Sequence, residues 1–408
     1  MKSRSRRNFL SNGLALGCSL AASPLFTPMT FASAPWENRL VVIILRGGMD
    51  GLDVVRPVGA PEFADLRAHA LDDGGHDLDG FFALHPALGG LMPLWQEGDL
   101  GFVHAVSTPY RDKRSHFDGQ DILEAGSGEA SAGRIRDGWL NRLLQNVPGA
   151  HAETAYAIGR ADMLLTRGAA RIADWSPDAA LSLSPQAERL LETVMHDDPL
   201  FRDAVTEALT LSAADVAEAN GQDESDDGDT MGGMQNMMQK ARSGARPETI
   251  ASFAAKRLRG DTRIAAFSLN GFDTHARQRA GLPRALDQLQ KAILTLKQEL
   301  GPVWGKTAVV AMTEFGRTAR VNGSGGTDHG TAGAMVLAGG AVRGGRVVSD
   351  WPGLDEAALY NRRDLLPTRD LRAHTGWMLR GLFGVEAQLL ESTVFPGLDL
   401  GGNPGLIL

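Results

Sequence analysis

The feature that most constrains the fold is a long amphipathic helix pattern between two short apolar runs. Leucine and isoleucine recur at three- and four-residue spacing from Pro283 to Leu300, which predicts a helix with one buried face. Pro283 suits its first turn, and Gly301-Pro302 ends it. The runs on either side, 263–269 and 307–312, predict strands. A strand, a helix and a strand in this order predict a βαβ unit of a parallel sheet.

Further apolar runs extend this pattern along the chain. The run 40–45 is rich in β-branched residues, which suits a strand buried on both faces. Other strand candidates lie at 99–106 and 334–338, and helical patterns at 139–144, 250–258 and 371–382. The 408 residues suit one large α/β domain or two modest ones. We predict one domain over 38–408, with a mostly parallel central sheet and helices on both faces.

Acids and histidines gather in the loops that follow four of these strand candidates. The stretch Gly326-Thr327-Asp328-His329-Gly330, soon after 307–312, places an aspartate beside a histidine between glycines. Loops at the carboxyl ends of parallel strands meet at one edge of a sheet. We therefore expect this stretch, together with Glu314 and Arg317 directly after 307–312, to meet the other three loops. The notable residues of those loops are Asp50, Ser115, His116, Asp273 and His275.

Each of these residues also has a simpler structural interpretation. Asp50 suits a turn or the N-cap of a short helix. His116 and Asp118 suit the cap of a following helix. If residues 273–275 are extended, Asp273 and His275 point the same way and can reach one ion together; otherwise they are an unrelated surface pair. His374 in the last predicted helix is a packing residue or a late ligand.

Charge and cysteine content narrow the class of protein. The net charge of −8 argues against nucleic-acid binding, which normally requires a basic face. The only cysteine, Cys18, lies in the N-terminal segment, so the mature chain has no disulfide and no thiolate metal site. Carboxylate and imidazole ligands without thiolates favour zinc, manganese or magnesium.

The N-terminus is typical of an export signal. Arg6-Arg7 with Phe9 and Leu10 matches the twin-arginine pattern, and the apolar stretch 14–25 is too short for a membrane span. Cleavage near Ala32 or Ala34 gives a signal peptide over 1–34 and a periplasmic or secreted protein without a membrane span. A lipoprotein site at Cys18 and a merely basic tail are the alternatives.

A second unusual segment lies in the middle of the chain. An acidic run at 223–229 precedes a methionine-rich stretch at 231–238, and neither has a periodic apolar face. We interpret about 212–245 as a flexible surface insertion. An acidic calcium loop is the alternative, although the glutamate spacing of such loops is absent.

Taken in order, these loops resemble an exported bacterial family called domain of unknown function 1501, within the alkaline-phosphatase-like superfamily of metallo-hydrolases and mutases. The resemblance covers nearly the whole mature chain. It is carried by Leu45-Arg46-Gly47-Gly48-Met49-Asp50-Gly51, His85-Pro86-Ala87-Leu88, Arg114-Ser115-His116-Phe117-Asp118, Gly271-Phe272-Asp273-Thr274-His275, Thr313-Glu314-Phe315-Gly316-Arg317, 325–331 and 350–354. It implies an alkaline-phosphatase-like three-layer sandwich.

The resemblance also implies roles for the loop residues. Asp50 would bind a metal ion together with Asp328 and His329, and Asp273 and His275 would bind a second ion. Glu314 falls where alkaline phosphatases place a carboxylate on a third ion. Ser115 lies near the position of the superfamily's nucleophile, beside His116, and Arg114 or Arg317 would grip substrate oxygens. The Asp273/His275 spacing and the sequence around Ser115 depart from the superfamily pattern.

These roles predict a periplasmic metal-dependent hydrolase of phosphate or sulfate esters. Two divalent ions would stabilise the attacking and leaving oxygens of a small-molecule or polysaccharide ester. The alternatives are a hydrolase of another bond class and a non-catalytic exported binding or assembly protein, which retains the fold with a degenerate or structural metal site.

Overall fold

The structure is a computed structural model that describes residues 36–128, 134–159, 163–176 and 246–408. The predicted signal peptide 1–34 and the predicted insertion at about 212–245 lie outside these residues. Within the described part of the chain, no helix is both long enough and apolar enough to cross a membrane.

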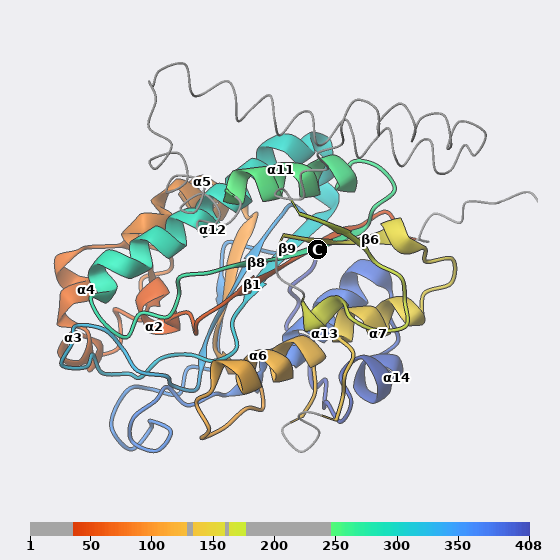
Figure 1. Cartoon of the computed structure of the whole chain (residues 1–408). Helices are drawn as coiled ribbons and strands as arrows, with labels where there is room; N and C mark the ends of the chain where they lie inside the picture. Colours follow the sequence, from red (N-terminus) through yellow and green to blue (C-terminus); the bar gives the residue numbers. More distant parts are fainter. Residues whose placement is uncertain (1–35, 129–133, 160–162, 177–245) are drawn as a thin grey trace, which may run out of the picture.

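A nine-stranded sheet forms the centre of the molecule (Figure 1). Its order is β11-β5-β10-β9-β1-β8-β6-β7, and β12 pairs with β5 beyond this path. The strands are β1 (Arg39–Leu45), β5 (Leu100–Ser107), β6 (Ala155–Ile158), β7 (Ala173–Trp175), β8 (Ile264–Leu269), β9 (Thr307–Met312), β10 (Gly333–Ala338), β11 (Val347–Val348) and β12 (Arg369–Asp370). All five strands that the sequence predicted are present.

The direction of pairing confirms a mostly parallel sheet. β1 lies between β8 and β9 and is parallel to both, with Val42 opposite Ala266 on one side and Val310 on the other. The βαβ unit formed by β8, α12 (Gln278–Leu300) and β9 therefore crosses over β1. β10 is antiparallel to β9 and β5, so β5 points the same way as β9. The carboxyl ends of β1, β5, β8 and β9 thus share one edge.

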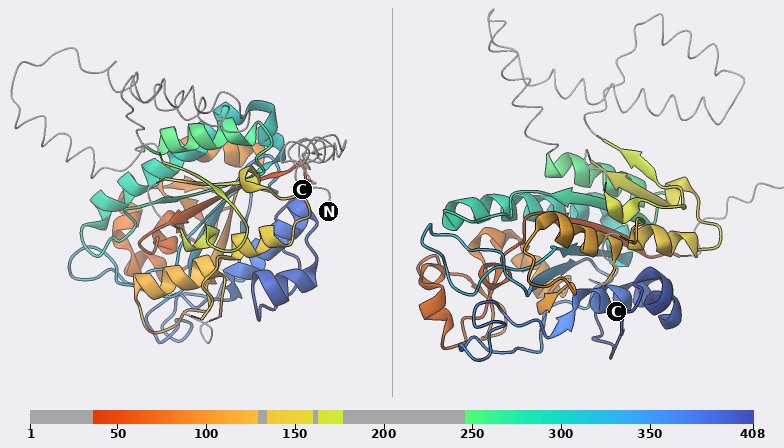
Figure 2. Two further views of the ribbon diagram at one scale, coloured as in Figure 1. Left: turned by 45° about the vertical axis from the view of Figure 1, so that its right-hand side comes forward. Right: turned by 60° about the horizontal axis from the view of Figure 1, so that its bottom comes forward.

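Helices cover both faces of this sheet, as the sequence predicted (Figures 1 and 2). Alternate residues of β1 explain why, because Val41 and Ile43 pack under one set of helices while Leu40 and Val42 pack under the other. The first layer holds α11 (Pro247–Leu258), α12 and α5 (Met92–Glu97). The second holds α6 (His116–Ala125), α7 (Trp139–Gln145) and α13 (Leu371–Phe383).

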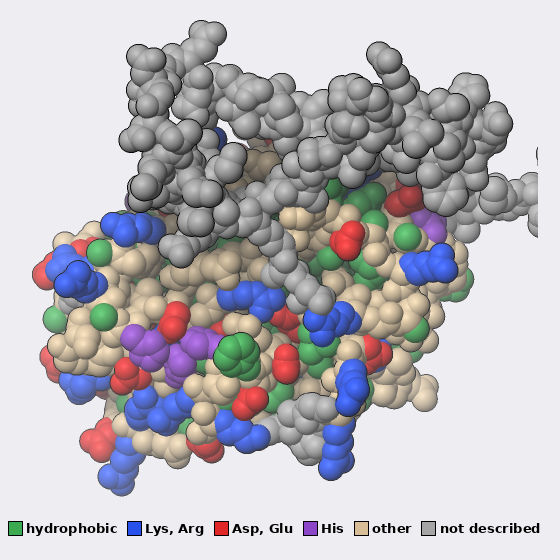
Figure 3. All heavy atoms as spheres, in the orientation of Figure 1, with side chains coloured by type: hydrophobic (Ala, Val, Ile, Leu, Met, Phe, Trp, Pro, Cys, Tyr) green, Lys and Arg blue, Asp and Glu red, His purple; other side chains and the backbone are tan. Residues whose placement is uncertain are grey.

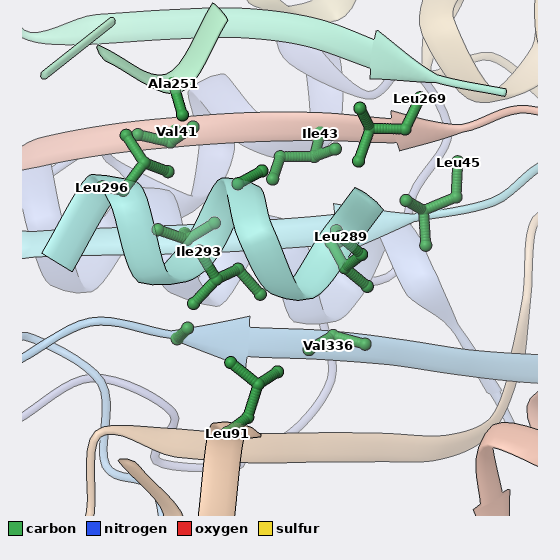
Figure 4. Close-up of a cluster of buried hydrophobic side chains, with 14 of the residues drawn as sticks. Val41, Ile43, Leu45, Leu91, Ala251, Leu269, Leu289, Ile293, Leu296 and Val336 are labelled. Carbon is green, nitrogen blue, oxygen red and sulfur yellow. The ribbon is translucent and has the colours of Figure 1, made fainter. Parts of the chain in front are cut away.

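The helix α12 carries the largest apolar face of the first layer. Leu289, Ile293 and Leu296 point onto β1, β9 and β10 in Figure 4, and all three are fully buried. α12 begins at Gln278, five residues before the predicted start, so Pro283 lies inside the helix and not in its first turn. A proline there removes one backbone hydrogen bond, and packing on the sheet outweighs that loss.

The segment between β1 and β5 folds over the shared edge of the sheet. It contains a small antiparallel sheet of order β2-β4-β3 and several short helices. Its elements are α2 (Gly51–Val54), β2 (Val55–Arg56), α3 (Phe63–Leu66), α4 (Ala68–Asp72), β3 (His76–Asp77), β4 (Ala83–Leu84) and η1 (Pro86–Leu91). The remaining short elements are η3 (Ala152–Thr154), η4 (Leu164–Thr166), η5 (Gly301–Lys306), α14 (Ala387–Leu389) and η6 (Leu390–Val394).

Candidate metal centre

Histidine and acidic side chains from three loops meet at the shared carboxyl edge of the sheet. Asp273 and His275 follow β8, and Glu314 follows β9. His329 lies in the loop between β9 and β10, and His116 opens α6 after β5. The space-filling view shows histidine side chains gathered at one place on this face (Figure 3). Parallel strands thus bring together residues that are more than two hundred positions apart in the sequence.

The carboxylate of Asp273 is the centre of this cluster. Its oxygens lie 3.4 Å from Nε2 of His116, 3.2 Å from Nε2 of His275 and 3.5 Å from Nε2 of His329. Asp273 and His275 have side chains 48% and 45% exposed, so the cluster opens to solvent on one side. Metal ligands in catalytic sites commonly keep such an open position for water or substrate.

An oxygen acceptor holds the other ring nitrogen of each imidazole. Nδ1 of His116 lies 2.8 Å from Oε1 of Glu314, and Nδ1 of His329 lies 2.7 Å from the carbonyl oxygen of Arg114. Nδ1 of His275 lies 3.3 Å from Oδ1 of Asp328. An imidazole whose Nδ1–H donates to such an oxygen has a lone pair on Nε2, and these contacts favour that tautomer of each neutral ring. Metal-binding histidines in proteins are oriented in this way.

The lone pairs that result fit a cation. Nε2 of His275 and Nε2 of His329 are only 2.8 Å apart, and Nε2 of His116 is buried with no hydrogen-bond partner among the described residues. Lone pairs that face one another and a carboxylate are stable only with a proton or a metal ion among them. Ligand atoms of His116, Asp273 and His329 all lie within 4.8 Å of one another, which suits a shared ion. The donors fit zinc or manganese better than a softer ion.

The protonation states of the cluster follow from its contacts. Burial opposes ionisation of Asp273, but the hydrogen bond and charge of Arg317 outweigh it and lower the pKa of this carboxyl. Burial lowers the pKa of His329, which favours the neutral, ligating form. The hydrogen bond to Glu314 raises the pKa of His116, so a proton competes with a cation for its Nε2.

The acids behind the imidazoles are themselves held ionised. Burial opposes ionisation of Glu314, but the hydrogen bond with His116 and others from Gly47 N–H and Gln120 lower the pKa of its carboxyl. A hydrogen bond donated by Asn322 lowers the pKa of Asp328. Both carboxylates therefore accept hydrogen bonds from the ring that they orient, and Glu314 lies behind His116 and not at the open side of the cluster.

An aromatic ring and two glycines fix the shape of this site. Phe315 is buried, and its ring lies 5.0 Å from that of His116 and 4.8 Å from that of His329. A side chain at Gly326 would begin 2.4 Å from the carbonyl oxygen of Thr274, and one at Gly330 would begin 2.3 Å from the backbone of Arg317. Glycine is therefore required at both ends of the Asp328-His329 pair, because the loops touch backbone to backbone.

Arg317 lies beneath the cluster, where it supports Asp273. It donates to Oδ1 of Asp273 over 2.7 Å, and its other donors bond to backbone carbonyls of Gly48, Gly47, Thr327 and Phe272. The side chain is fully buried. These bonds occupy the guanidinium group, so Arg317 has no pair of donors left for a substrate. The family resemblance had implied that it grips substrate oxygens.

Asp50 lies under the Gly326–Gly330 loop but apart from the cluster. It is fully buried, and its two oxygens accept hydrogen bonds from Arg67 over 2.7 and 3.1 Å and from Gln278 over 2.7 Å. It also caps α2, which matches the simpler interpretation of this residue. The structure therefore places a guanidinium where the resemblance implied a metal ion, and Asp50 does not share a cation pocket with Asp328 and His329.

Ser115 is the N-cap of α6. Its hydroxyl oxygen accepts a hydrogen bond from the backbone N–H of Asp118 over 3.4 Å. The capping role expected for His116 or Asp118 thus belongs to Ser115. His374 is buried in α13, far along the chain from any ligand loop, and burial lowers its pKa to about 3. No described residue joins it to the cluster, which fits the packing interpretation.

Several residues of the site gave no signal in the sequence. Arg67 lies in the irregular segment after β1, and Gln278 opens α12; both converge on Asp50. Asn322 orients Asp328, and Gln120 orients Glu314 over 3.2 Å. Polar residues in loops without a motif are indistinguishable from solvent-exposed ones until the fold brings them together. A spacing of four between His116 and Gln120 on a predicted helix was the one available signal.

Fold and site together define an α/β protein with a candidate mononuclear metal centre at the carboxyl edge of its sheet. Residues 102–380 match the family described as protein of unknown function (DUF1501), and the chain belongs to that family. No curated protein matches the chain.

Solved structures that resemble this chain include members of the alkaline phosphatase superfamily. A protein of that superfamily from Vibrio parahaemolyticus is 13% identical, with 95% of this chain and 78% of that chain covered and a TM-score of 0.41. The lipoteichoic acid synthase LtaP from Listeria monocytogenes is 10% identical, with 93% and 79% covered and a TM-score of 0.41. Alkaline phosphatase from the Antarctic bacterium TAB5 is 9% identical, with 77% and 94% covered and a TM-score of 0.35.

Proposed function

We propose that this protein is a metal-dependent hydrolase of phosphate or sulfate esters. The observation that carries the proposal is the convergence of three Nε2 atoms on Asp273, each from an imidazole whose Nδ1 faces an oxygen acceptor. Such an arrangement holds a divalent cation, zinc, manganese or magnesium, with one side open to solvent.

The roles of the residues follow from their placement. His116, Asp273 and His329 hold the cation, and His275 completes the set from the exposed side. Glu314, Asp328 and Arg317 position these ligands and do not touch substrate. A bound cation polarises an ester oxygen and increases the acidity of water. We assign the contact with a substrate oxygen to Arg114, because its side chain is exposed and its carbonyl lies against His329.

We assign the attack on the ester to water and not to Ser115. The Ser115 hydroxyl serves the first turn of α6, and its backbone N–H donates to the hydroxyl of Tyr110 over 2.6 Å. The first contact engages the hydroxyl in the helix cap, and the second ties the backbone of Ser115 to the preceding loop. Water reaches the cluster from the side on which Asp273 and His275 are exposed.

We further propose that the chain is exported by the twin-arginine pathway and acts in the periplasm or outside the cell. The support is the Arg6-Arg7 pattern with its weakly apolar segment. Export of a folded protein allows the metal centre to be loaded before transport. Small-molecule or polysaccharide esters are the substrates proposed.

One observation favours a second candidate, a non-catalytic exported protein that binds its partner through a structural metal ion. Arg67 neutralises Asp50, so the ion that the resemblance implied for Asp50, Asp328 and His329 has lost a ligand. Ser115 is a helix cap and offers no evident nucleophile. This candidate predicts a bound metal ion without turnover of any ester.

Metal content and ester turnover in matched variants test these proposals. We expect about one zinc or manganese ion per chain by elemental analysis of the exported protein, and turnover of aryl phosphates or aryl sulfates. Asp273→Asn is expected to abolish both, whereas Asp287→Asn, an aspartate of nearly equal exposure on α12, retains both. Wild-type protein free of metal would overturn both candidates. Bound metal without turnover of either ester class would favour the second.

A further inference from the structure

We propose that a cavity beside the metal centre binds the sugar part of the substrate, a polyhydroxylated leaving group of one or two rings. The proposal rests on the proposed ester hydrolysis and names the class of ester. The cavity has a volume of about 520 Å³ and lies between the loop 318–322, the turn 354–363 and α3. Pockets of this size hold small organic ligands.

The cavity and the metal centre share a wall. Asp328, which orients His275, also lines the cavity. Arg363 lines it as well and donates a hydrogen bond to the backbone carbonyl of His329 over 3.1 Å. A ligand in the cavity therefore lies next to two of the residues that build the centre. An ester oxygen at the centre and its leaving group in the cavity can belong to one molecule.

The charged side chains that line the cavity include both hydrogen-bond donors and acceptors without partners. No ion pair engages Arg320 within the described residues. Arg362 forms an ion pair with Glu356 at 3.7 Å, in which both side chains remain strongly exposed. Glu62, the N-cap of α3, and Asp65 on α3 likewise have no ion pair in the described chain. Hydroxyl groups both donate and accept, so a polyhydroxylated ligand satisfies both kinds of side chain at once.

The charge balance of the lining argues against other ligand classes. Five carboxylates, those of Glu62, Asp65, Asp328, Asp355 and Glu356, face three arginines, those of Arg320, Arg362 and Arg363. The excess of carboxylates disfavours a polyanionic leaving group. Most of the lining side chains are polar or charged, which disfavours an apolar one. A neutral sugar, whose many hydroxyls both donate and accept, matches a polar lining that carries charges of both signs.

The turn that carries Arg362 contains left-handed backbone and is tied to a neighbouring loop by hydrogen bonds. Asn361 and Arg362 are consecutive non-glycine residues in left-handed conformation, with φ of 51° and 55°. The turn is tied to the loop after β5, because the Tyr360 hydroxyl and Nδ2 of Asn361 both donate to Asp112, at 3.2 and 3.3 Å. Such strain persists where surrounding contacts enforce it and is concentrated at binding sites.

A comparison of two esters tests the cavity. We measure kcat/KM for glucose 6-phosphate and for p-nitrophenyl phosphate, and for the corresponding sulfates. Arg320→Ala and Arg362→Ala should each lower the ratio of sugar ester to aryl ester about tenfold, the effect of losing one charge-assisted hydrogen bond. Arg284→Ala, an exposed arginine on α12 outside the cavity, should leave the ratio unchanged. A ratio within twofold of wild type in both cavity variants overturns the proposal.

Sugar binding without chemistry separates this proposal from the proposed function. Maltose binding to the purified wild-type protein is measured by isothermal titration calorimetry. We expect binding that weakens about tenfold in Arg320→Ala and is unchanged in Arg284→Ala. Wild-type protein that turns over aryl esters but binds no maltose overturns the sugar cavity alone. Maltose binding that depends on Arg320, without turnover of any ester, supports the cavity and counts against hydrolysis.

Discussion

Two aspartates at neighbouring strand ends show how differently one fold treats the same residue. Asp50 follows β1 and is fully buried against Arg67, whereas Asp273 follows β8 and is 48% exposed among three imidazoles. Both carboxylates have an arginine partner, Arg67 for Asp50 and Arg317 for Asp273. Asp273 differs because it also faces three imidazole nitrogens, whose lone pairs repel one another unless a proton or a cation lies among them. A conspicuous acid after a buried strand is therefore no evidence of a metal ligand until its neighbours are known.

Two histidines repeat this contrast. His104 on β5 is buried beneath α2; its Nδ1 accepts from the N–H of Ala105, and its Nε2 lies 2.9 Å from the carbonyl oxygen of Val55. Backbone groups thus satisfy both of its nitrogens. His116 keeps a buried Nε2 without a hydrogen-bond partner in the described chain. The buried polar groups around Asp50 have hydrogen-bond partners within the chain, whereas a buried ring nitrogen beside Asp273 has none among the described residues.

The largest effect on stability is expected from breaking the buried Asp50–Arg67 pair. Arg67→Met leaves an uncompensated buried carboxylate and should lower the free energy of unfolding by about 3–5 kcal/mol. Chemical denaturation of metal-free protein measures the loss, and metal content of the folded fraction should stay at the wild-type level. Loss of metal with little loss of stability would instead make Asp50 a ligand and remove the contrast.

The next effect is a dependence of stability on pH that arises from the buried His104. Burial lowers the pKa of His104 to about 4, below the usual 6.5, so the unfolded chain binds a proton that the folded chain does not. Between pH 6.5 and 4 the free energy of unfolding should therefore fall as pH falls, by up to about 3 kcal/mol from this residue. Denaturation curves of metal-free wild type and His104→Gln should converge toward pH 4. Parallel curves would contradict the assignment.

A smaller effect, on metal affinity, is expected from changing Glu314, the residue that orients His116. Glu314→Gln keeps the shape of the side chain but weakens the bond that orients His116, so metal affinity should fall about 10–100-fold. Competition with a chromophoric chelator measures this change. Glu124→Gln, a buried glutamate that pairs with Arg46 outside the cluster, is the matched control and should keep wild-type affinity. Equal affinities in all three proteins would remove Glu314 from the centre.

The smallest effect is expected at Thr327, which lies between the buried surroundings of Asp50 and the metal centre around Asp273. Thr327 belongs to the same loop as Asp328, but its hydroxyl donates toward Gln278 over 2.7 Å and lies 3.3 Å from Asp50. Thr327→Val should cost about 1 kcal/mol of stability and leave metal affinity within about threefold of wild type. The same chelator competition, together with thermal unfolding, checks both numbers. A large drop in affinity would show that the two regions act as one site.

The sequence alone determined the layers of the fold and the edge at which the site lies. Apolar runs such as 40–45 and 307–312 are buried on both faces of a parallel sheet, so their composition predicts strands without knowledge of any partner. The direction of such strands then places their following loops together, which is why Asp273, Glu314 and His329 could be grouped in advance. Family membership followed from the same loops.

Only the tertiary structure decided what each of these residues contacts. Arg67 reaches Asp50 from an irregular segment, and Arg317 is surrounded by backbone carbonyls, and neither contact leaves a periodic pattern in the sequence. The orientation of each imidazole depends on one acceptor, such as the Arg114 carbonyl, whose position is set by loop conformation. Hydrophobic periodicity specifies where a chain is buried, whereas hydrogen-bond partners of buried polar groups depend on the packing of distant segments.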